Sequence, residues 1–276
     1  HSANPKHLWN SLNTLLSRKT TSPSLPSVSS ITDLASSFLE FFNGKITKLC
    51  SAFPVHHQSL THDVAQPSSQ PHSLTFFHPA TTDEVKSAIL ASSDASCSLD
   101  IIPTSLLKSC LESLLVPVTN IINLSLVEGK FPDIYKKALV SPLLKKHNMP
   151  IEDLTSYRPI SNLNFISKIL ERIIHSRLTT HLHTFPSLTA FQSAYRPFHS
   201  TETALLRIQN DLLLAIDQQK LTALLLLDLS SAFDTIDHTI LLSRLSSTYG
   251  IAGSALNLLS SYLINRTQSI RINSHT

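Results

Sequence analysis

The feature that most constrains the fold is an apolar run that ends in an acid. Residues 221–238 read LTALLLLDLSSAFDTIDH, and Leu221–Leu227 carries no charge before Asp228. Such a run predicts a strand that is buried on both faces. An uncompensated carboxylate is costly to bury, so Asp228 should lie at the exposed end of this strand or beside partners. The competing interpretation is that Asp228 only caps the following helix, because Asp is a good N-cap.

Strand-like and helix-like stretches alternate after Gly129, which predicts an α+β fold. Residues 138–146 (ALVSPLLKK) predict a short strand, which Pro142 restricts to an edge or a bulge. Residues 156–164 and 191–200 are rich in turn-forming residues and predict two links.

Apolar spacing places helices around these links. One helix is predicted from Phe165 to Leu178. The next should point four apolar residues inward, namely Leu205, Ile208, Leu212 and Ile216. Ser231 and Asp234 have the form of a capping box for a helix that ends near Gly250.

The N-terminal half is helical and rich in linkers. Residues 1–75 predict a linker with one helix at 32–47, which we expect to pack loosely because Ser/Pro-rich stretches flank it. Residues 76–127 predict a helical extension that begins with a capping box at Thr81 and is interrupted at Pro117. Residues 128–276 form the third predicted unit.

Composition excludes several classes of protein. The three cysteines have no metal-ligand spacing and argue against a disulfide scaffold. No apolar run approaches the roughly 18 residues of a membrane span, so we expect no membrane partner. Residues 129–276 hold 15 basic and 10 acidic side chains, which makes this half the better candidate for binding a polyanion.

Two motifs pair an arginine with a proline, Tyr157-Arg158-Pro159 and Tyr195-Arg196-Pro197. A guanidinium fixed by a rigid turn suits bidentate binding of phosphate, although a surface arginine that stabilises a turn is the alternative. Phe233 follows Asp228 by five residues, and its ring could close over a pocket at Asp228 or simply pack in the core.

Taken in order, YRPISNLNFISKILERII, FQSAYRPFHSTETALL and LLLLDLSSAFDTIDHTILLSRL resemble the first signature blocks of reverse transcriptases from LINE-type, non-LTR retrotransposons. The upstream stretches IPTSLLKSCL and NIINLSLVEGKFPDIYKKALVSPLLKK resemble the segment before those blocks, and LWNSLNTLLSRK resembles the link to the endonuclease region. The resemblance implies a right-hand polymerase, here with fingers and a partial palm preceded by the helical, linker-rich extension.

The resemblance also implies roles for single residues. Asp228 would be the first palm carboxylate and bind Mg²⁺, with the backbone carbonyl of Leu229 nearby. Phe233 would be the aromatic gate against a ribose 2′-OH. Arg158 and Arg196 would face nucleotide phosphates or the template. Asp234 and Asp237 are expected to be helix-start acids, and Ala194 stands where the family usually has Gly.

The implied partners are an RNA template, a DNA primer, deoxynucleoside triphosphates and the rest of a parent polyprotein, in the nucleus and cytoplasm. Two-metal nucleotidyl transfer needs several carboxylates, and the chain contains no aromatic-Ala-Asp-Asp sequence. We therefore expect a truncated RNA-directed DNA polymerase that is inactive alone.

Two alternatives stay open. A non-catalytic nucleic-acid-binding remnant would fit the basic second half. A different magnesium phosphotransferase is less well supported, because Ser230 stands where a haloacid-dehalogenase-like enzyme needs Asp, and no GxxxxGK occurs.

Overall fold

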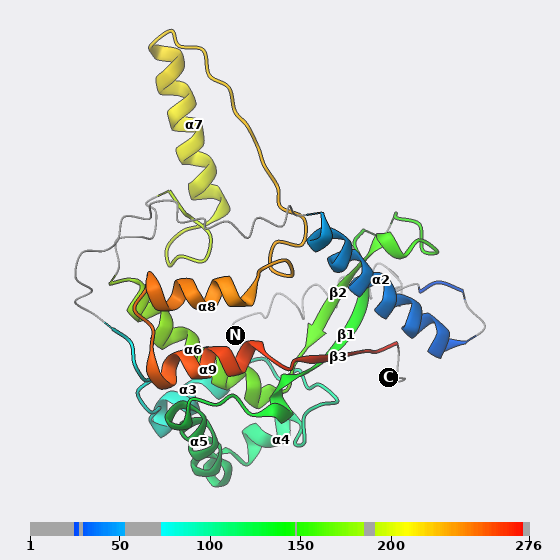
Figure 1. Cartoon of the computed structure of the whole chain (residues 1–276), viewed down its shortest axis with the longest axis vertical. Coiled ribbons are helices and arrows are strands. Elements are labelled where there is room, and N and C mark those ends of the chain that lie inside the picture. The colour runs from blue at the N-terminus through cyan, green and yellow to red at the C-terminus, as the bar shows by residue number, and fades with distance from the viewer. Residues whose placement is uncertain (1–24, 28–29, 53–72, 147, 185–190, 273–276) are drawn as a thin grey trace, which may run out of the picture.

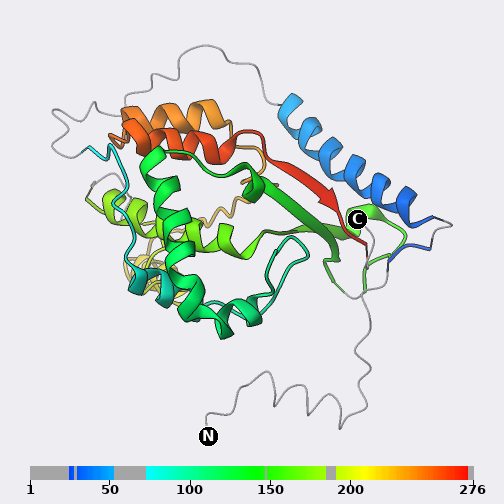
Figure 2. The same ribbon diagram turned by 90° about the horizontal axis from the view of Figure 1, so that it is seen from below.

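The computed structural model describes residues 25–27, 30–52, 73–146, 148–184 and 191–272. It has an α+β fold in which a cluster of helices adjoins a three-stranded sheet (Figures 1 and 2). The stretch LWNSLNTLLSRK and most of the two predicted linkers, 20–30 and 51–75, lie outside the described residues. The predicted boundaries at 75 and 127 stay predictions.

The sheet has the order β2-β1-β3 and mixes both pairings. β1 (Lys137–Leu144) pairs antiparallel with β2 (Tyr157–Asn162) and parallel with β3 (Thr267–Ile270). The prediction that β1 is an edge strand is therefore wrong. Pro142 is tolerated because β3 pairs only with residues 137–140, and on its other side Pro142 faces Pro159, which also lacks an N–H.

The link predicted at 156–164 is instead mostly strand β2. A one-turn 3₁₀ helix, Leu154–Ser156, precedes the strand, and Asn164 follows it as the N-cap of the next helix. The predicted rigid turn around Arg158 is thus wrong, because the Tyr-Arg-Pro motif is extended. β2 is an edge strand, where a proline costs little.

α2 (Ile31–Ser51) packs along one face of the sheet, as Figure 2 shows, so the prediction of loose packing is wrong. Its Phe38 is fully buried and meets the Tyr157 ring edge to face, with centroids 5.0 Å apart. Val140 and Ile270 of the sheet belong to the same small core between α2 and the sheet, which is separate from the main core of the helices. Alternation along β2 then places Arg158 on the opposite face from Tyr157.

The main core lies among the helices α3 (Thr82–Leu90), α4 (Thr104–Ser109), α5 (Leu111–Glu128), α6 (Phe165–Leu182) and α9 (Gly253–Leu263). The capping box predicted at Thr81 is partly confirmed, since its side chain accepts a hydrogen bond from the Glu84 N–H at 3.2 Å. The predicted helix from Phe165 is also confirmed. Pro117 lies inside α5, so the predicted interruption there is wrong, and the break falls at Cys110.

α5 is long and apolar enough to cross a membrane by length and composition, the one such helix among the described residues. The sequence predicts no membrane span, because Glu112, Pro117 and Asn120 interrupt the apolar residues of this stretch. In this structure Ile122 and Leu126 of α5 are fully buried in the main core. A core helix can pass the same test of length and composition.

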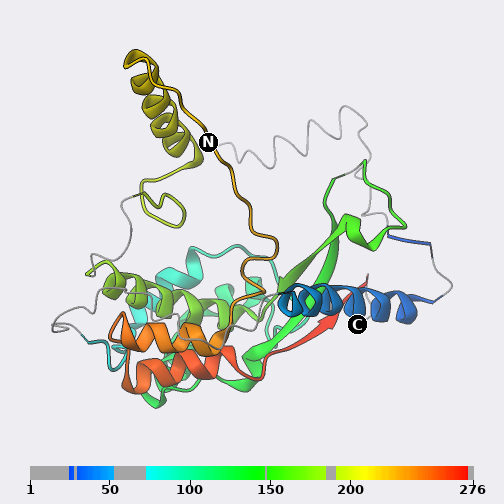
Figure 3. The same cartoon turned by 45° about the horizontal axis from the view of Figure 1, so that its top comes forward.

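α7 (Thr201–Asp217) projects away from the body, and the chain returns beside it without secondary structure (Figures 1 and 3). The helix is confirmed, but its predicted inward face is wrong because no residue of α7 is buried. The predicted strand at Leu221–Leu227 is wrong as well: the segment is exposed and pairs with no described strand. A strand without a hydrogen-bonded neighbour is not stable alone.

α8 (His238–Ser247) begins later than predicted. Residues 231–235 form a turn in which the Asp234 N–H donates to the Ser231 carbonyl at 2.9 Å. Ser231 has φ 52°, which is not the extended backbone of an N-cap. The predicted capping box is therefore wrong, and Asp237 is the cap. Gly250, with φ 64°, follows the end of α8 in the left-handed conformation, as predicted for the C-terminus of this helix.

Two polar contacts fix the upstream helical extension to α6. Asp100 accepts from the Phe165 N–H at 2.6 Å, at the N-terminus of α6. The Arg177 guanidinium donates two hydrogen bonds to the Glu84 carboxylate, at 2.7 and 2.9 Å. Its Nε–H also donates to the His78 carbonyl at 2.6 Å. The side chains of α3, α4 and α5 in this extension also share one hydrophobic core with α6 and α9.

Candidate nucleotide and nucleic-acid interface

The open face of the β1–β2 hairpin presents the first predicted site residue. Arg158 pairs in register with Leu143, and Ile160 with Ser141. Leu143 and Ile160 are both partly exposed, so the face bears apolar side chains beside a guanidinium. Among the described residues no acid lies within ion-pair distance of Arg158, whose fork is free to bind an anion.

The second predicted link, 191–200, is confirmed as turns without helix or strand. Tyr195 has φ 59° and Phe198 has φ 62°, whereas Ala194 is not among the residues with positive φ. The expected need for a left-handed backbone therefore falls one residue later, on Tyr195. Arg196 donates from Nη1 to the Gln192 carbonyl at 3.2 Å, which closes the turn.

This turn meets the segment after Asp228 through two aromatic rings. Tyr195 and Phe233 lie edge to face with centroids 6.3 Å apart. Both rings are mostly exposed, so the pair is not core packing. The structure thus brings together two of the predicted site blocks, those of Arg196 and Phe233.

Asp228 and Leu229 lie in the extended, exposed segment that returns from α7. Within the described part of the chain, no hydrogen bond or ion pair joins Asp228 to Arg158. The predicted cleft shared by Asp228 and Arg158 stays a prediction.

The two nearby acids have structural surroundings. Asp237 caps α8, since its Oδ1 accepts from the N–H groups of Thr239 and Ile240 at 2.8 and 3.1 Å. These bonds hold the pKa of the Asp237 carboxyl below its usual range. The prediction of a helix-start acid is confirmed for Asp237, whereas Asp234 lies in the preceding turn.

The residues that the structure describes contain no group of three or more His, Cys, Asp or Glu side chains placed to hold a metal ion. A two-metal centre needs several carboxylates around both ions. Asp228, exposed and without a neighbouring acid ligand, does not fit that requirement by itself.

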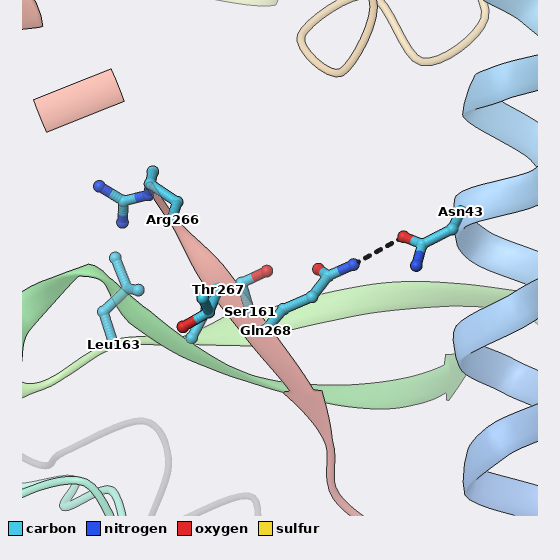
Figure 4. A pocket seen from close by; sticks show the side chains of 7 residues that line it. Asn43, Ser161, Leu163, Arg266, Thr267 and Gln268 are labelled. Atoms are coloured by element: carbon cyan, nitrogen blue, oxygen red, sulfur yellow. Dashed lines mark hydrogen bonds between the residues drawn. The ribbon is translucent and has the colours of Figure 1, made fainter. Parts of the chain in front are cut away.

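A polar cavity of about 440 Å³ lies elsewhere, between α2 and the sheet (Figure 4). It is lined by Asn43, Ala138, Ser161, Leu163, Arg266, Thr267 and Gln268. The Gln268 Nε2 donates to the Asn43 Oδ1 at 2.9 Å across one end of the cavity. Sequence reasoning missed these residues, because nothing local in the sequence signals that α2 and β3 are neighbours.

A buried cluster supports Arg266 at the other end of the cavity. Its guanidinium carbon lies 4.6 Å from the centre of the Tyr262 ring, and Nη1 donates to the Tyr262 carbonyl at 3.1 Å. Burial raises the pKa of the nearby Glu171 carboxyl, while the Arg266 charge opposes that shift. The Ser167 hydroxyl donates to Glu171 at 3.2 Å.

Comparison with known proteins accounts for the order of these blocks. Residues 144–274 match the profile of the family described as reverse transcriptase (RNA-dependent DNA polymerase). The chain is 29% identical over 201 residues to a probable RNA-directed DNA polymerase from transposon X-element of Drosophila melanogaster, covering 73% of this chain and 22% of that protein. That match is longer than residues 144–276, so it also includes part of the upstream helical extension.

Two further relatives are RNA-directed DNA polymerases from mobile element jockey. The Drosophila melanogaster protein is 35% identical over 124 residues, which cover 45% of this chain and 13% of that protein. The Drosophila funebris protein is 29% identical over 170 residues, or 61% of this chain and 18% of that protein. The chain thus spans about a fifth or less of the length of these curated relatives. Residues 144–274 match the reverse transcriptase family, and the chain is similar to RNA-directed DNA polymerases from Drosophila transposons and mobile elements.

Proposed function

We propose that this chain supplies the fingers and the first acidic block of the palm in a retrotransposon RNA-directed DNA polymerase. The observation that carries the proposal is the family match, which spans Arg158, Arg196, Asp228 and Phe233 in one continuous stretch. The contact between Tyr195 and Phe233 supports it, because it joins two of these blocks in space.

In the proposed function each site residue has one role. Asp228 is a ligand of Mg²⁺, with the carbonyl of Leu229 beside it. Arg158, on the open face of the hairpin, binds the phosphates of the incoming deoxynucleoside triphosphate or the template strand. Arg196, in the 191–200 turn, also binds the nucleotide phosphates or the template strand. Phe233 excludes a ribose 2′-OH by occupying its space. An RNA template and a DNA primer are the partners.

We further propose that the 276-residue chain does not catalyse synthesis by itself. Two-metal nucleotidyl transfer requires several carboxylates that hold both ions. Asp228 needs further carboxylates to hold such a pair, and the described residues do not place any beside it. The role of this chain would then be to bind template and nucleotide.

A second candidate function is non-catalytic binding of nucleic acid. The specific observation in its favour is the basic excess after residue 128, together with the absence of an acid cluster among the described residues. Binding of this kind depends on phosphate contacts and weakens steeply as salt rises.

Primer extension separates the two candidates. A protein that continues the chain through a full palm should extend a DNA primer on an RNA template with magnesium, and Asp228→Ala should abolish extension. Asp211→Ala is the matched control, because Asp211 is an exposed acid on α7. Equal extension by wild type and Asp228→Ala would exclude the metal-ligand role of Asp228. Absence of extension by the wild type would leave the binding function as the conclusion.

A further inference from the structure

We propose that the cavity between α2 and β3 is a second binding site for single-stranded nucleic acid, in which Arg266 binds a phosphate and the Asn43–Gln268 pair contacts the adjoining base or sugar. The cavity lies on the α2 side of the sheet, because Ser161 shares a face of β2 with Tyr157, which packs on α2. Arg158 lies on the opposite face, so the two sites are separate. The proposal concerns binding and does not depend on synthesis.

The charge of the lining points to an anionic ligand. Arg266 is the one charged residue among those that line the cavity, and no acid lines it. Within the described ranges no carboxylate lies within ion-pair distance of Arg266. A guanidinium has five N–H donors, and one bond to the Tyr262 carbonyl leaves most of its fork available. A planar fork of this kind matches a phosphate group.

The position of Arg266 is fixed before any ligand binds. The Tyr262 ring stacks under the guanidinium and in turn meets the Phe131 ring edge to face, with centroids 5.0 Å apart. Phe131 is fully buried, so this support is part of the main core. A side chain held in place loses little conformational entropy on binding, which favours affinity.

The other end of the cavity offers a mixed hydrogen-bonding edge. Because the Gln268 Nε2 already donates to the Asn43 Oδ1, the amide nitrogen of Asn43 remains a donor and the Gln268 oxygen remains an acceptor. Figure 4 shows this amide pair at the α2 end, with Thr267 and Ser161 between it and Arg266. A paired donor and acceptor complement the polar edge of an unpaired base.

The size of the cavity agrees with one nucleotide unit. Its volume of about 440 Å³ falls within the usual range of small-ligand sites. It is open to solvent, so a strand can enter and leave while one nucleotide occupies it. Neutral hydroxyl and amide groups beside one arginine favour a nucleotide over a cationic or purely apolar ligand.

The test measures binding of a fluorescently labelled eight-residue oligouridine to the 276-residue chain by anisotropy, at several salt concentrations. Arg266→Gln should weaken binding about tenfold and reduce the salt slope by about one. Arg244→Gln is the matched control, because Arg244 is exposed on α8 and is not among the residues that line this cavity. Circular dichroism checks that each variant folds.

A second variant keeps the test decisive if Arg266→Gln does not fold. Asn43→Asp preserves the shape and the acceptor for Gln268 but adds a negative charge at an exposed helix position, so it should also weaken binding. Ser37→Asp adds the same charge to α2 outside the cavity and should not. Photo-crosslinking of a 4-thiouridine oligonucleotide should label peptides of α2 and β3. Wild-type affinity in both cavity variants would overturn the proposal, as would equal affinity for free uridine monophosphate, which would indicate a mononucleotide site.

Discussion

Tyr195 and Phe233 meet edge to face, with their ring centroids 6.3 Å apart, although the whole of α7 separates them in the sequence. The contact ties the turn that carries Arg196 to the segment that follows Asp228. Tyr195 adopts φ 59°, an unfavourable conformation for a residue with a Cβ. The Tyr195 ring is held against Phe233 by this backbone conformation and can therefore position the Phe233 ring.

The first prediction concerns Phe233 in a polymerase-competent protein that contains this chain. Phe233→Val should increase incorporation of ribonucleotides relative to deoxyribonucleotides, because the smaller side chain leaves room for the 2′-OH. Tyr195→Ala should have a weaker effect in the same direction, since Phe233 loses its neighbour, whereas Tyr195→Phe keeps the ring and should behave as wild type. The measurement is the ratio of kcat/KM for the two nucleotides. An unchanged ratio in Phe233→Val would remove the gate role.

The second prediction compares two glycines. Gly129 ends α5 with φ 66°, and an added Cβ would lie 2.6 Å from the Ser254 carbonyl oxygen. Gly129→Ala should therefore destabilise the fold by at least about 1–2 kcal/mol. Gly44, inside α2, has nothing within 4 Å of an added Cβ, so Gly44→Ala should stabilise by about 0.5–1 kcal/mol. Urea unfolding measures both, and equal effects would contradict the packing of α5 against α9.

The third prediction concerns the Arg177–Glu84 pair. Hydrogen bonding to Arg177 holds the pKa of the Glu84 carboxyl below its usual range. A carboxylate with a lowered folded pKa contributes stability above its unfolded pKa, and the contribution is lost as pH falls through the folded pKa. Glu84→Gln should cost about 1 kcal/mol at pH 7, because Glu84 is partly exposed, and much less at pH 3.

Thermal unfolding across this pH range tests the pair. Glu112→Gln is the control, because Glu112 pairs with Lys86 by a single bond at the surface, and its effect on Tm should be smaller. A Glu84→Gln deficit in Tm that stays constant between pH 7 and pH 3 would show that the pair is not the source of the stability.

Local signals predicted much of the helical structure and little of the sheet. The cap at Thr81, the helix from Phe165 and the left-handed stop at Gly250 each depend on a few neighbouring residues, and all three are present. β3 pairs with β1 although residues 145–266 separate the two strands in the sequence. No local sequence pattern could reveal that the two strands are neighbours. The apolar run at Leu221–Leu227 predicted a buried strand and misled, because the segment is exposed and no described strand lies beside it.

The candidate site divides in the same way. The family blocks identified Arg158, Asp228 and Phe233 as candidates, but only packing could place Arg158 on the open face of β2. The cavity near Arg266 could not be predicted at all, because Asn43 and Gln268 meet only through the contact of α2 with β3.

The fourth prediction concerns the exposed apolar surface of α7 and the segment beside it. Leu206, Leu213, Leu225 and Leu227 are each at least half exposed. Contiguous apolar surface of this kind promotes association. The 276-residue chain should bind the dye ANS and self-associate at micromolar concentration, and Leu225→Ser with Leu227→Ser should reduce both. Ile101→Ser with Val127→Ser, two exposed sites elsewhere, is the control. A monomeric chain without ANS binding would show that this surface is covered in solution.

The last prediction separates the chain from the polymerase family to which it is related. With magnesium, an RNA template and a DNA primer, the purified 276-residue chain should give no templated synthesis, because Asp228 has no neighbouring carboxylate among the described residues to hold a metal pair with it. It should still bind RNA, with an affinity that falls as salt rises, since the basic excess lies after residue 128. Arg158→Gln should weaken this binding and reduce its salt slope by about one, as expected for one lost phosphate contact. Primer extension by this chain, lost in Asp228→Ala, would contradict the prediction and mean that another acid, such as Asp234, moves to complete the metal site.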